Sequence, residues 1–168
     1  MNLKPIVLYT TRPIRANETD GVEYHFADEA KLQEFLQADR VIELREYHTM
    51  HGIWKYFTVD DENIDLEKQD YLAIGTLESF EKMKNYFGQE TVIPIYIEVE
   101  DGVRLERALK RERKQEQPKY EEMCRRFLAD QQDFSEEKLQ QAGIARRFRN
   151  DGDRQMCMDE VAEFIRLL

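Results

Sequence analysis

The chain has 168 residues, of which 41% are hydrophobic and 36% charged, a composition typical of a globular protein with a heavily charged surface. Its 25 Lys and Arg residues against 35 Asp and Glu residues give a formal charge of -10, which excludes general nucleic-acid binding because phosphates would be repelled. No apolar run approaches the ~20 residues of a membrane span, so no membrane partner is predicted. The two cysteines make no disulfide framework, which predicts a cytoplasmic protein with reduced thiols.

Strand-forming and helix-forming runs alternate along the chain. Short β-branched or aromatic runs predict strands at 6–9, 41–44, 71–74 and 92–99. Apolar residues at helical spacing, or runs of helix-favouring residues, predict helices around 32–36, 77–87, 105–114, 120–128 and 161–168. This alternation predicts an α/β fold with a mostly parallel sheet. Between Gly21 and Val59 the pattern is richer in strands, which indicates a small mixed subdomain.

The segment from Thr10 to Phe26 combines cationic, acidic and aromatic residues around a turn. Arg12 and Arg15 lie three residues apart, Glu18 follows, and Tyr24 returns on an expected strand. An arginine fork binds phosphate oxygens in pairs, and a tyrosine hydroxyl can donate a further hydrogen bond. Composition alone equally allows a surface loop held together by Arg–Glu pairs.

The order of these residues closely resembles the GMP-binding signature of guanylate kinases, T-T-R-x-x-R-x-x-E-x-x-G-x-x-Y-x-F. Every letter is present, at Thr10, Thr11, Arg12, Arg15, Glu18, Gly21, Tyr24 and Phe26. The resemblance implies a P-loop-kinase-like parallel sheet with helices, a small mixed GMP-binding subdomain at 12–66 and lid-like helices at 102–128. The remainder of a single domain, 1–168, would form the core.

The resemblance also implies roles for individual residues. The positions of Arg12, Arg15 and Tyr24 hold the GMP phosphate in the family, and we place Arg12 among the catalytic residues as well. Glu43 matches the glutamate that reads guanine. A carboxylate can accept from guanine N1–H and N2–H together, whereas adenine offers no such donor pair. Without the resemblance, Glu43 would be an ordinary exposed glutamate on a strand.

Two further residues are expected near the base and the phosphate. The family carries a Gly-x-Tyr-Tyr-Gly-Ser/Thr turn, and the segment 52–58 is one residue longer and lacks the second glycine. By this match Thr58 would supply the hydroxyl that touches guanine, and Tyr56 would support the phosphate. Leu8 stands where the family has a serine. Residues 71–79 lack the family's aspartates, for which Thr76 or Glu78 could substitute.

A basic cluster in the second half of the chain allows two interpretations. Arg107 and Arg111 are four residues apart and would share one face of a helix. Such a charge run is usually a solvated face. The resemblance instead implies that Arg107, Arg111 and, from the next helix, Arg126 form a lid over the phosphates of ATP. Asn150 matches a residue near the adenine site, or belongs to a turn that caps the last helix. ATP and Mg²⁺ are implied by the family only, and no metal site is predicted from the residues.

One motif of the family is missing from the sequence. Its ATP phosphates lie in a P-loop, G-x-x-x-x-G-K-[ST], but no two of the seven glycines here are five residues apart. The chain begins at what resembles the family's second strand, without the first strand, P-loop and helix. We therefore expect phosphate transfer from ATP to GMP to be impaired. Strand edges left unpaired would favour a homodimer or strand exchange.

Two other functions stay open at this level. A domain with this signature could be a non-catalytic interaction module that binds phosphorylated peptides through the former GMP site. It could also be a GMP sensor that binds the nucleotide without chemistry. The joint presence of Arg12, Arg15, Tyr24 and Glu43 favours a nucleotide over a peptide.

Overall fold

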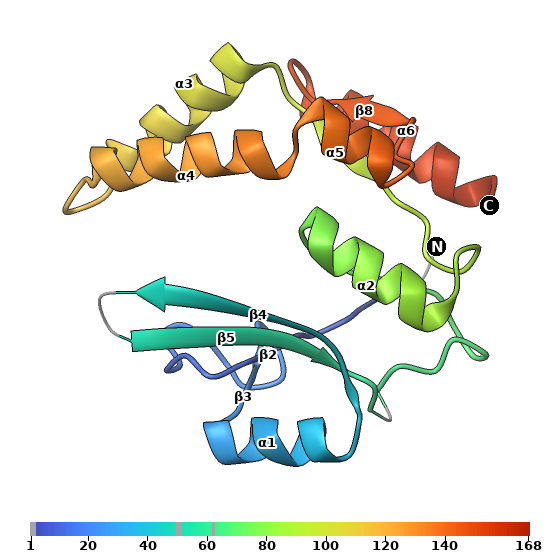
Figure 1. The fold of residues 1–168 in the computed structure, drawn as a ribbon. Helices are drawn as coiled ribbons and strands as arrows, with labels where there is room; N and C mark the ends of the chain where they lie inside the picture. The colour runs from blue at the N-terminus through green and yellow to red at the C-terminus, as the bar shows by residue number, and fades with distance from the viewer. Residues whose placement is uncertain (1–2, 50–51, 62) are drawn as a thin grey trace. The chain divides into compact units, whose positions relative to one another are not determined.

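The computed structural model describes residues 3–49, 52–61 and 63–168. The chain divides into two compact units, unit 1 (Met1–Val92) and unit 2 (Ile93–Leu168). Figure 1 colours unit 1 from blue to green and unit 2 from yellow to red. The predicted boundaries at 12–66 and 102–128 do not coincide with this division and stay predictions.

Unit 1 contains two sheets. One pairs β1 (Lys4–Pro5) with β6 (Tyr71–Leu72) in parallel. The other has the order β3-β2-β5-β4, formed by β3 (His25–Phe26), β2 (Tyr9–Thr10), β5 (Gly52–Val59) and β4 (Val41–Thr49). β2 and β3 are parallel, whereas β5 is antiparallel to both of its neighbours. This is a mixed sheet, in the strand-rich part of the chain where the sequence predicted one.

The main core of unit 1 lies between the mixed sheet and α1 (Glu29–Gln37). Leu32 and Phe35 of the helix pack with Phe57 and Val59 of β5, and all four side chains are buried. Asp28 begins the helix by accepting a hydrogen bond from the N–H of Lys31 at 2.8 Å. The second helix, α2 (Leu77–Phe87), lies on the opposite side of the sheet in Figure 1. The sheet therefore has one apolar face for α1 and a second face that the site uses.

The first predicted strand, 6–9, is divided between the two sheets. Lys4 and Pro5 pair with β6, and Tyr9 and Thr10 pair with β3 and β5. Residues between them cross from one sheet to the other, so the apolar run is continuous while the strand is not. The predicted strand at 92–99 is likewise shorter, at Tyr96–Glu98, and Pro94 just ahead of it has no N–H to donate to a neighbouring strand.

Unit 2 pairs two short parallel strands and carries four helices. Its strands are β7 (Tyr96–Glu98) and β8 (Arg147–Arg149). Its helices are α3 (Asp101–Glu112), α4 (Tyr120–Asp133), α5 (Glu136–Gln141) and α6 (Arg154–Arg166). Arg147 joins two of these elements, because its guanidinium bonds Glu98 at 2.8 Å and Glu136 at 2.6 Å. Phe148 of β8 is fully buried, with its ring centroid 5.4 Å from that of Phe164 on α6.

The predicted α/β class with parallel strand pairing and helices is confirmed, since β1–β6, β2–β3 and β7–β8 all run parallel. In the part of the chain that the structure describes, no helix is both long enough and apolar enough to cross a membrane.

Candidate functional site

The two threonines of the signature fasten its turn to β5. The Thr10 hydroxyl and the Thr11 N–H both donate to the carbonyl of Lys55, at 2.9 and 3.0 Å. The Lys55 N–H returns a hydrogen bond to the Thr11 hydroxyl at 3.0 Å. Farther along, Gly21 adopts a φ of +79° and donates to the carbonyl of Tyr24 at 2.8 Å. The backbone between β2 and β3 is thus fixed at both ends.

Arg12 is buried inside this turn rather than presented to solvent. Its guanidinium forms a bidentate ion pair with the Glu18 carboxylate, with hydrogen bonds of 2.6 and 2.7 Å. It also donates to the carbonyl of Pro13 at 3.0 Å. Its guanidinium carbon lies 4.9 Å from the ring centroid of Tyr24. The hydrogen bonds with Glu18 raise the pKa of Arg12, and in return Arg12 lowers the pKa of Glu18 to about 2. The Arg12 fork is therefore already occupied by a carboxylate.

Arg15 is placed differently, although it belongs to the same turn. Its backbone N–H donates to Glu18 at 2.9 Å, whereas its side chain is exposed and makes no hydrogen bond to another residue that the structure describes. Tyr24 lies at the end of the turn, just before β3. Its ring packs edge-on against that of Tyr56 on β5, with 5.5 Å between the ring centroids. Arg15 is the cation of the signature that an anionic ligand could reach.

Glu43 lies at the centre of a buried polar cluster. Its side chain is 1% exposed, yet both carboxylate oxygens are bonded. Oε1 accepts from the Thr58 hydroxyl at 3.0 Å, and Oε2 accepts from the Ser79 hydroxyl at 3.3 Å. Arg45 donates to both oxygens, with Nε at 3.0 Å and Nη2 at 3.3 Å. The predicted partners Glu43 and Thr58 are thus brought together, and two further donors join them.

The strand register explains why these residues meet. Glu43 lies opposite Thr58, and Arg45 lies opposite Tyr56, in the antiparallel β4–β5 ribbon. Because side chains alternate between the faces of a strand, Glu43 and Arg45 share one face while Phe57 points to the core on the other. One face of the ribbon therefore carries the predicted guanine-reading pair and, next to it, Tyr56.

Ser79 comes from the first turn of α2. Thr76 caps this helix, with its hydroxyl accepting from the Ser79 N–H at 3.3 Å, and Glu78 instead pairs with Lys82 at 2.7 Å. Neither Thr76 nor Glu78 makes a hydrogen bond to Glu43, so Ser79 is the residue of this segment that reaches the carboxylate. Neither Ser79 nor Arg45 was predicted from the sequence as part of the site. The signal for Arg45 was its position two residues after Glu43 on a strand, which puts both side chains on one face.

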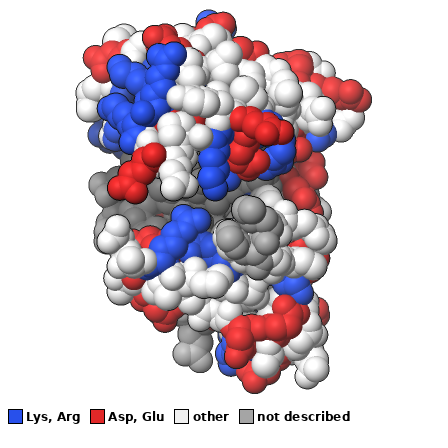
Figure 2. All heavy atoms as spheres, turned by 90° about the vertical axis from the view of Figure 1, so that its left-hand side faces the viewer, with Lys and Arg blue, Asp and Glu red and all other residues white. Residues whose placement is uncertain are grey.

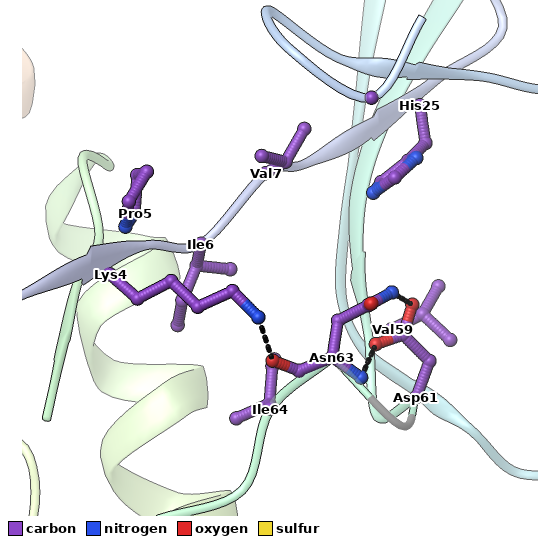
Figure 3. Close-up of a pocket in the computed structure, with 10 residues that line it drawn as sticks. Lys4, Pro5, Ile6, Val7, His25, Val59, Asp61, Asn63 and Ile64 are labelled. Atoms are coloured by element: carbon purple, nitrogen blue, oxygen red, sulfur yellow. Dashed lines mark hydrogen bonds between the residues drawn. The ribbon is translucent and has the colours of Figure 1, made fainter. Parts of the chain in front are cut away.

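Unit 1 also contains a small cavity of about 130 Å³ that is lined by Lys4, His25, Asp61 and Asn63, among others (Figure 3). Its polar groups bond to one another. Asn63 donates twice to Asp61, at 2.9 Å each, and Lys4 donates to the Asn63 carbonyl at 3.4 Å. Ligand pockets usually measure about 300–1,000 Å³, so this cavity is too small for a nucleotide.

Unit 2 carries the predicted lid arginines in two different environments. Arg107 is half-buried and donates to the backbone carbonyls of Asn150 and Asp151, at 2.7 and 3.3 Å. Arg111 is exposed one turn farther along α3. Arg126 on α4 is paired with Glu122 at 2.7 Å, and Arg125 bonds the same carboxylate. These two cations lower the pKa of Glu122 to about 2.

Four cations line a shallow, open hollow of about 260 Å³, with Arg107, Lys110 and Arg111 on α3 and Lys114 just beyond its end. Figure 2 looks onto the end of unit 2 where the α3–α4 hairpin turns, and Lys and Arg side chains gather there. The structure thus brings Arg107 and Arg111 together and adds Lys110 and Lys114, whereas Arg126 does not line the hollow. Such a surface attracts phosphate groups.

Asn150 follows β8 and bonds across to β7, its N–H donating to the Glu98 carbonyl at 2.9 Å. Its side-chain oxygen is buried and has no hydrogen-bond partner among the described residues. A buried acceptor without a donor is uncommon and fits a ligand that brings an amino group. The described residues contain no group of three His, Cys, Asp or Glu side chains that could hold a metal ion.

Three comparisons with known proteins agree with one another. A family model described as guanylate kinase matches residues 2–138. The guanylate kinase of Aliivibrio fischeri is 36% identical over 62 residues, which cover 34% of this chain and 30% of that protein. The matched segment therefore spans under a third of this curated relative. The crystal structure of guanylate kinase from Anaplasma phagocytophilum superposes with a TM-score of 0.63 at 19% identity, covering 98% of this chain and 74% of that one. At 19% identity, this structural match supports a shared fold and nothing more.

Proposed function

The chain belongs to the guanylate kinase family, and from this premise we propose that unit 1 binds GMP. The observation that carries the proposal is the buried carboxylate of Glu43, held by Thr58 and Ser79 on the ribbon face that also carries Tyr56. Glu43 reads the N1–H and N2–H of guanine. Arg15 and Tyr24 receive the phosphate, and Arg12 acts by holding Glu18 and the turn in place.

The reaction that this site serves is transfer of the terminal phosphoryl group of ATP to GMP, giving GDP. Catalysis of this kind relies on positioning and on cations that offset the charge of the transferring group. In unit 2 we assign Arg107, Arg111 and Arg126 to the phosphates of ATP. We assign Asn150 to adenine, because its unpartnered oxygen can accept from the 6-amino group. Mg²⁺ would supply further charge neutralisation and arrive on the nucleotide phosphates.

We expect the 168-residue chain to catalyse this transfer slowly at best. Its sequence contains no G-x-x-x-x-G-K-[ST] motif, whose backbone N–H groups and lysine hold the ATP phosphates. The lack of this cradle favours a second candidate function, a GMP sensor that binds without turnover. We assign the activity to the cytoplasm, which the two free cysteines favour.

Calorimetric titration with GMP tests the binding proposal. GMP binding should be lost in Arg15→Ala and in Glu43→Gln, but kept in Lys31→Ala, which removes an exposed cation of unit 1 that pairs with Glu34. A coupled assay with ATP and GMP then separates a slow kinase from a sensor. Failure to bind GMP, together with binding of a phosphorylated peptide through Arg15, would instead identify an interaction module.

We also propose that the chain self-associates through strand edges. Among the residues that the structure describes, β6 pairs with β1 on one side only within unit 1, and β7 pairs only with β8 within unit 2. Apolar side chains near these strands are exposed, with Ile74 at 86% and Ile97 at 49%. Exposed edges with apolar side chains invite further strands. Sedimentation over a concentration series should show a dimer, and a monomer at every concentration would contradict this.

A further inference from the structure

The hydrogen bonds of Glu43 leave no acceptor position for a base. A carboxylate has about four lone-pair positions, two on each oxygen. Thr58 and Ser79 each use one, and the Arg45 fork uses the other two. Solvent has little access to the ion pair of Glu43 and Arg45, since the two side chains are 1% and 13% exposed. A guanine can bind Glu43 only after one of the present donors has left.

Arg45 is the donor that guanine would replace. Thr58 and Ser79 have short side chains fixed on β5 and at the start of α2, whereas Arg45 reaches Glu43 with a long, flexible one. The chemistry also matches. Nε–H and Nη2–H of a guanidinium form a parallel fork, as do N1–H and N2–H of guanine, and either fork fits one carboxylate.

We propose that Arg45 is an internal mimic of guanine that occupies the base-reading carboxylate and competes with GMP. This inference rests on the proposed GMP site and adds a determinant of its affinity. Guanine supplies two donors and can replace both bonds that Arg45 gives up. Hypoxanthine, which lacks the 2-amino group, supplies one, and the matching edge of adenine has an acceptor at N1. Arg45 therefore lowers the affinity of every base that has to displace it from Glu43, and a base without the donor pair regains fewer of the hydrogen bonds that are broken.

Removal of the competitor should strengthen GMP binding. In Arg45→Ala we expect GMP to bind on the order of tenfold more tightly than in the unmodified chain, because binding no longer breaks a charge-assisted pair. IMP binding through Glu43 should remain weaker than GMP binding but tighten by a similar factor, because the cost of releasing Arg45 does not depend on the base, and AMP should gain nothing through Glu43. Arg45→Gln keeps one neutral donor and should give an intermediate GMP affinity. Lys31→Ala, the same surface control as above, should bind GMP as the unmodified chain does.

Calorimetry with GMP, IMP and AMP on these four proteins decides between the outcomes, with thermal melts to confirm that each is folded. If the unmodified chain binds GMP and both Arg45 variants bind it equally or more weakly, the competitor is refuted while the GMP site stands. If neither the unmodified chain nor any Arg45 variant binds GMP, the proposed function fails, and this inference with it.

A direct readout does not depend on the folding of a variant. The Arg45 Nε–H, bonded to a buried carboxylate, should give a slowly exchanging proton signal in an NMR spectrum of the unmodified protein. Saturation with GMP should move this signal and expose the proton to solvent exchange. A signal that is unchanged at saturating GMP would overturn the displacement of Arg45.

Discussion

The paired arginines Arg12 and Arg45 of unit 1 and the cations around the hollow of unit 2 are held in opposite ways. In unit 1, Arg12 and Arg45 are buried or nearly so, and each is bonded by two prongs to a carboxylate, Glu18 or Glu43. In unit 2, four cations on α3 and just beyond its end line an open hollow, and of these only Arg107 has a side-chain hydrogen bond to another residue that the structure describes. The two arginines of unit 1 are thus fixed by carboxylates, whereas the cations around the hollow of unit 2 are held loosely.

This difference suggests which residues can be changed without harm to the fold. A buried ion pair that loses one partner leaves an uncompensated charge in a dry place, which is strongly destabilising. An exposed cation that is removed changes the local potential and little else. Removal of one charge should therefore lower stability at a buried pair such as Glu43 with Arg45, whereas at an exposed cation such as Arg111 it should affect mainly anion binding.

The largest loss of stability is expected from Glu43→Ala. This change leaves Arg45 charged and unpaired and deprives Thr58 and Ser79 of their acceptor. Breaking a buried pair in this way costs roughly 3–5 kcal/mol of unfolding free energy. Urea unfolding should show this as a lower midpoint. The double variant Glu43→Ala/Arg45→Met, which removes both charges, should recover part of the loss, and no recovery would mean that packing rather than charge dominates.

The effect of low pH on stability should also distinguish the ion pairs of the two units. The hydrogen bonds from Arg12 hold the pKa of Glu18 at about 2, below its ordinary value of 4.5. The unfolded chain therefore takes up this proton first, so the stabilisation from Glu18 is complete above pH 4.5 and is lost as pH falls toward 2. Stability measured from pH 7 to pH 3 should fall less steeply in Glu18→Gln than in the unmodified chain.

Glu122 provides the matched control for this experiment. Its pKa is also lowered to about 2, but its partners Arg125 and Arg126 are 65% and 71% exposed, against 3% for Arg12. Salt screens exposed pairs far more than buried ones. In 0.5 M NaCl, Glu122→Gln should therefore match the unmodified chain while Glu18→Gln still differs. Equal salt sensitivity of the two variants would remove the distinction between the units.

Within unit 2, Arg107→Ala should have a moderate effect. Its guanidinium bonds two backbone carbonyls that follow β8, at Asn150 and Asp151. Each such bond contributes about 0.5–1.5 kcal/mol, so the variant should lose roughly 1–2 kcal/mol of unfolding free energy. Arg107→Lys should recover little, because a single ammonium group cannot reproduce the fork. Full stability of Arg107→Ala would show that these bonds do not hold β8 to α3.

The sequence predicted the parts of this protein that depend on local patterns. The α/β class follows from alternating apolar periodicities, and the signature from Thr10 to Phe26 identified the turn that carries Arg12 and Arg15. The sequence could not predict that Arg12 is buried and paired with Glu18 while the Arg15 side chain is exposed, because both arginines have the same local neighbours. It also missed Ser79, which reaches Glu43 across 36 residues of sequence. Such contacts are set by packing of α2 on the sheet.

The smallest effect on stability, and the sharpest separation of function from fold, is expected from Arg111→Ala. Arg111 is exposed on α3 and its side chain makes no hydrogen bond to a residue that the structure describes, so its removal should change unfolding free energy by less than about 0.5 kcal/mol. Binding of inorganic triphosphate should nevertheless weaken roughly two- to fivefold at low salt, because one of four cations around the hollow is lost. Arg113→Ala is the matched control, since Arg113 is exposed at the end of the same helix but does not line the hollow. Equal weakening in both variants would mean that net charge, and not the hollow on α3, attracts the phosphates.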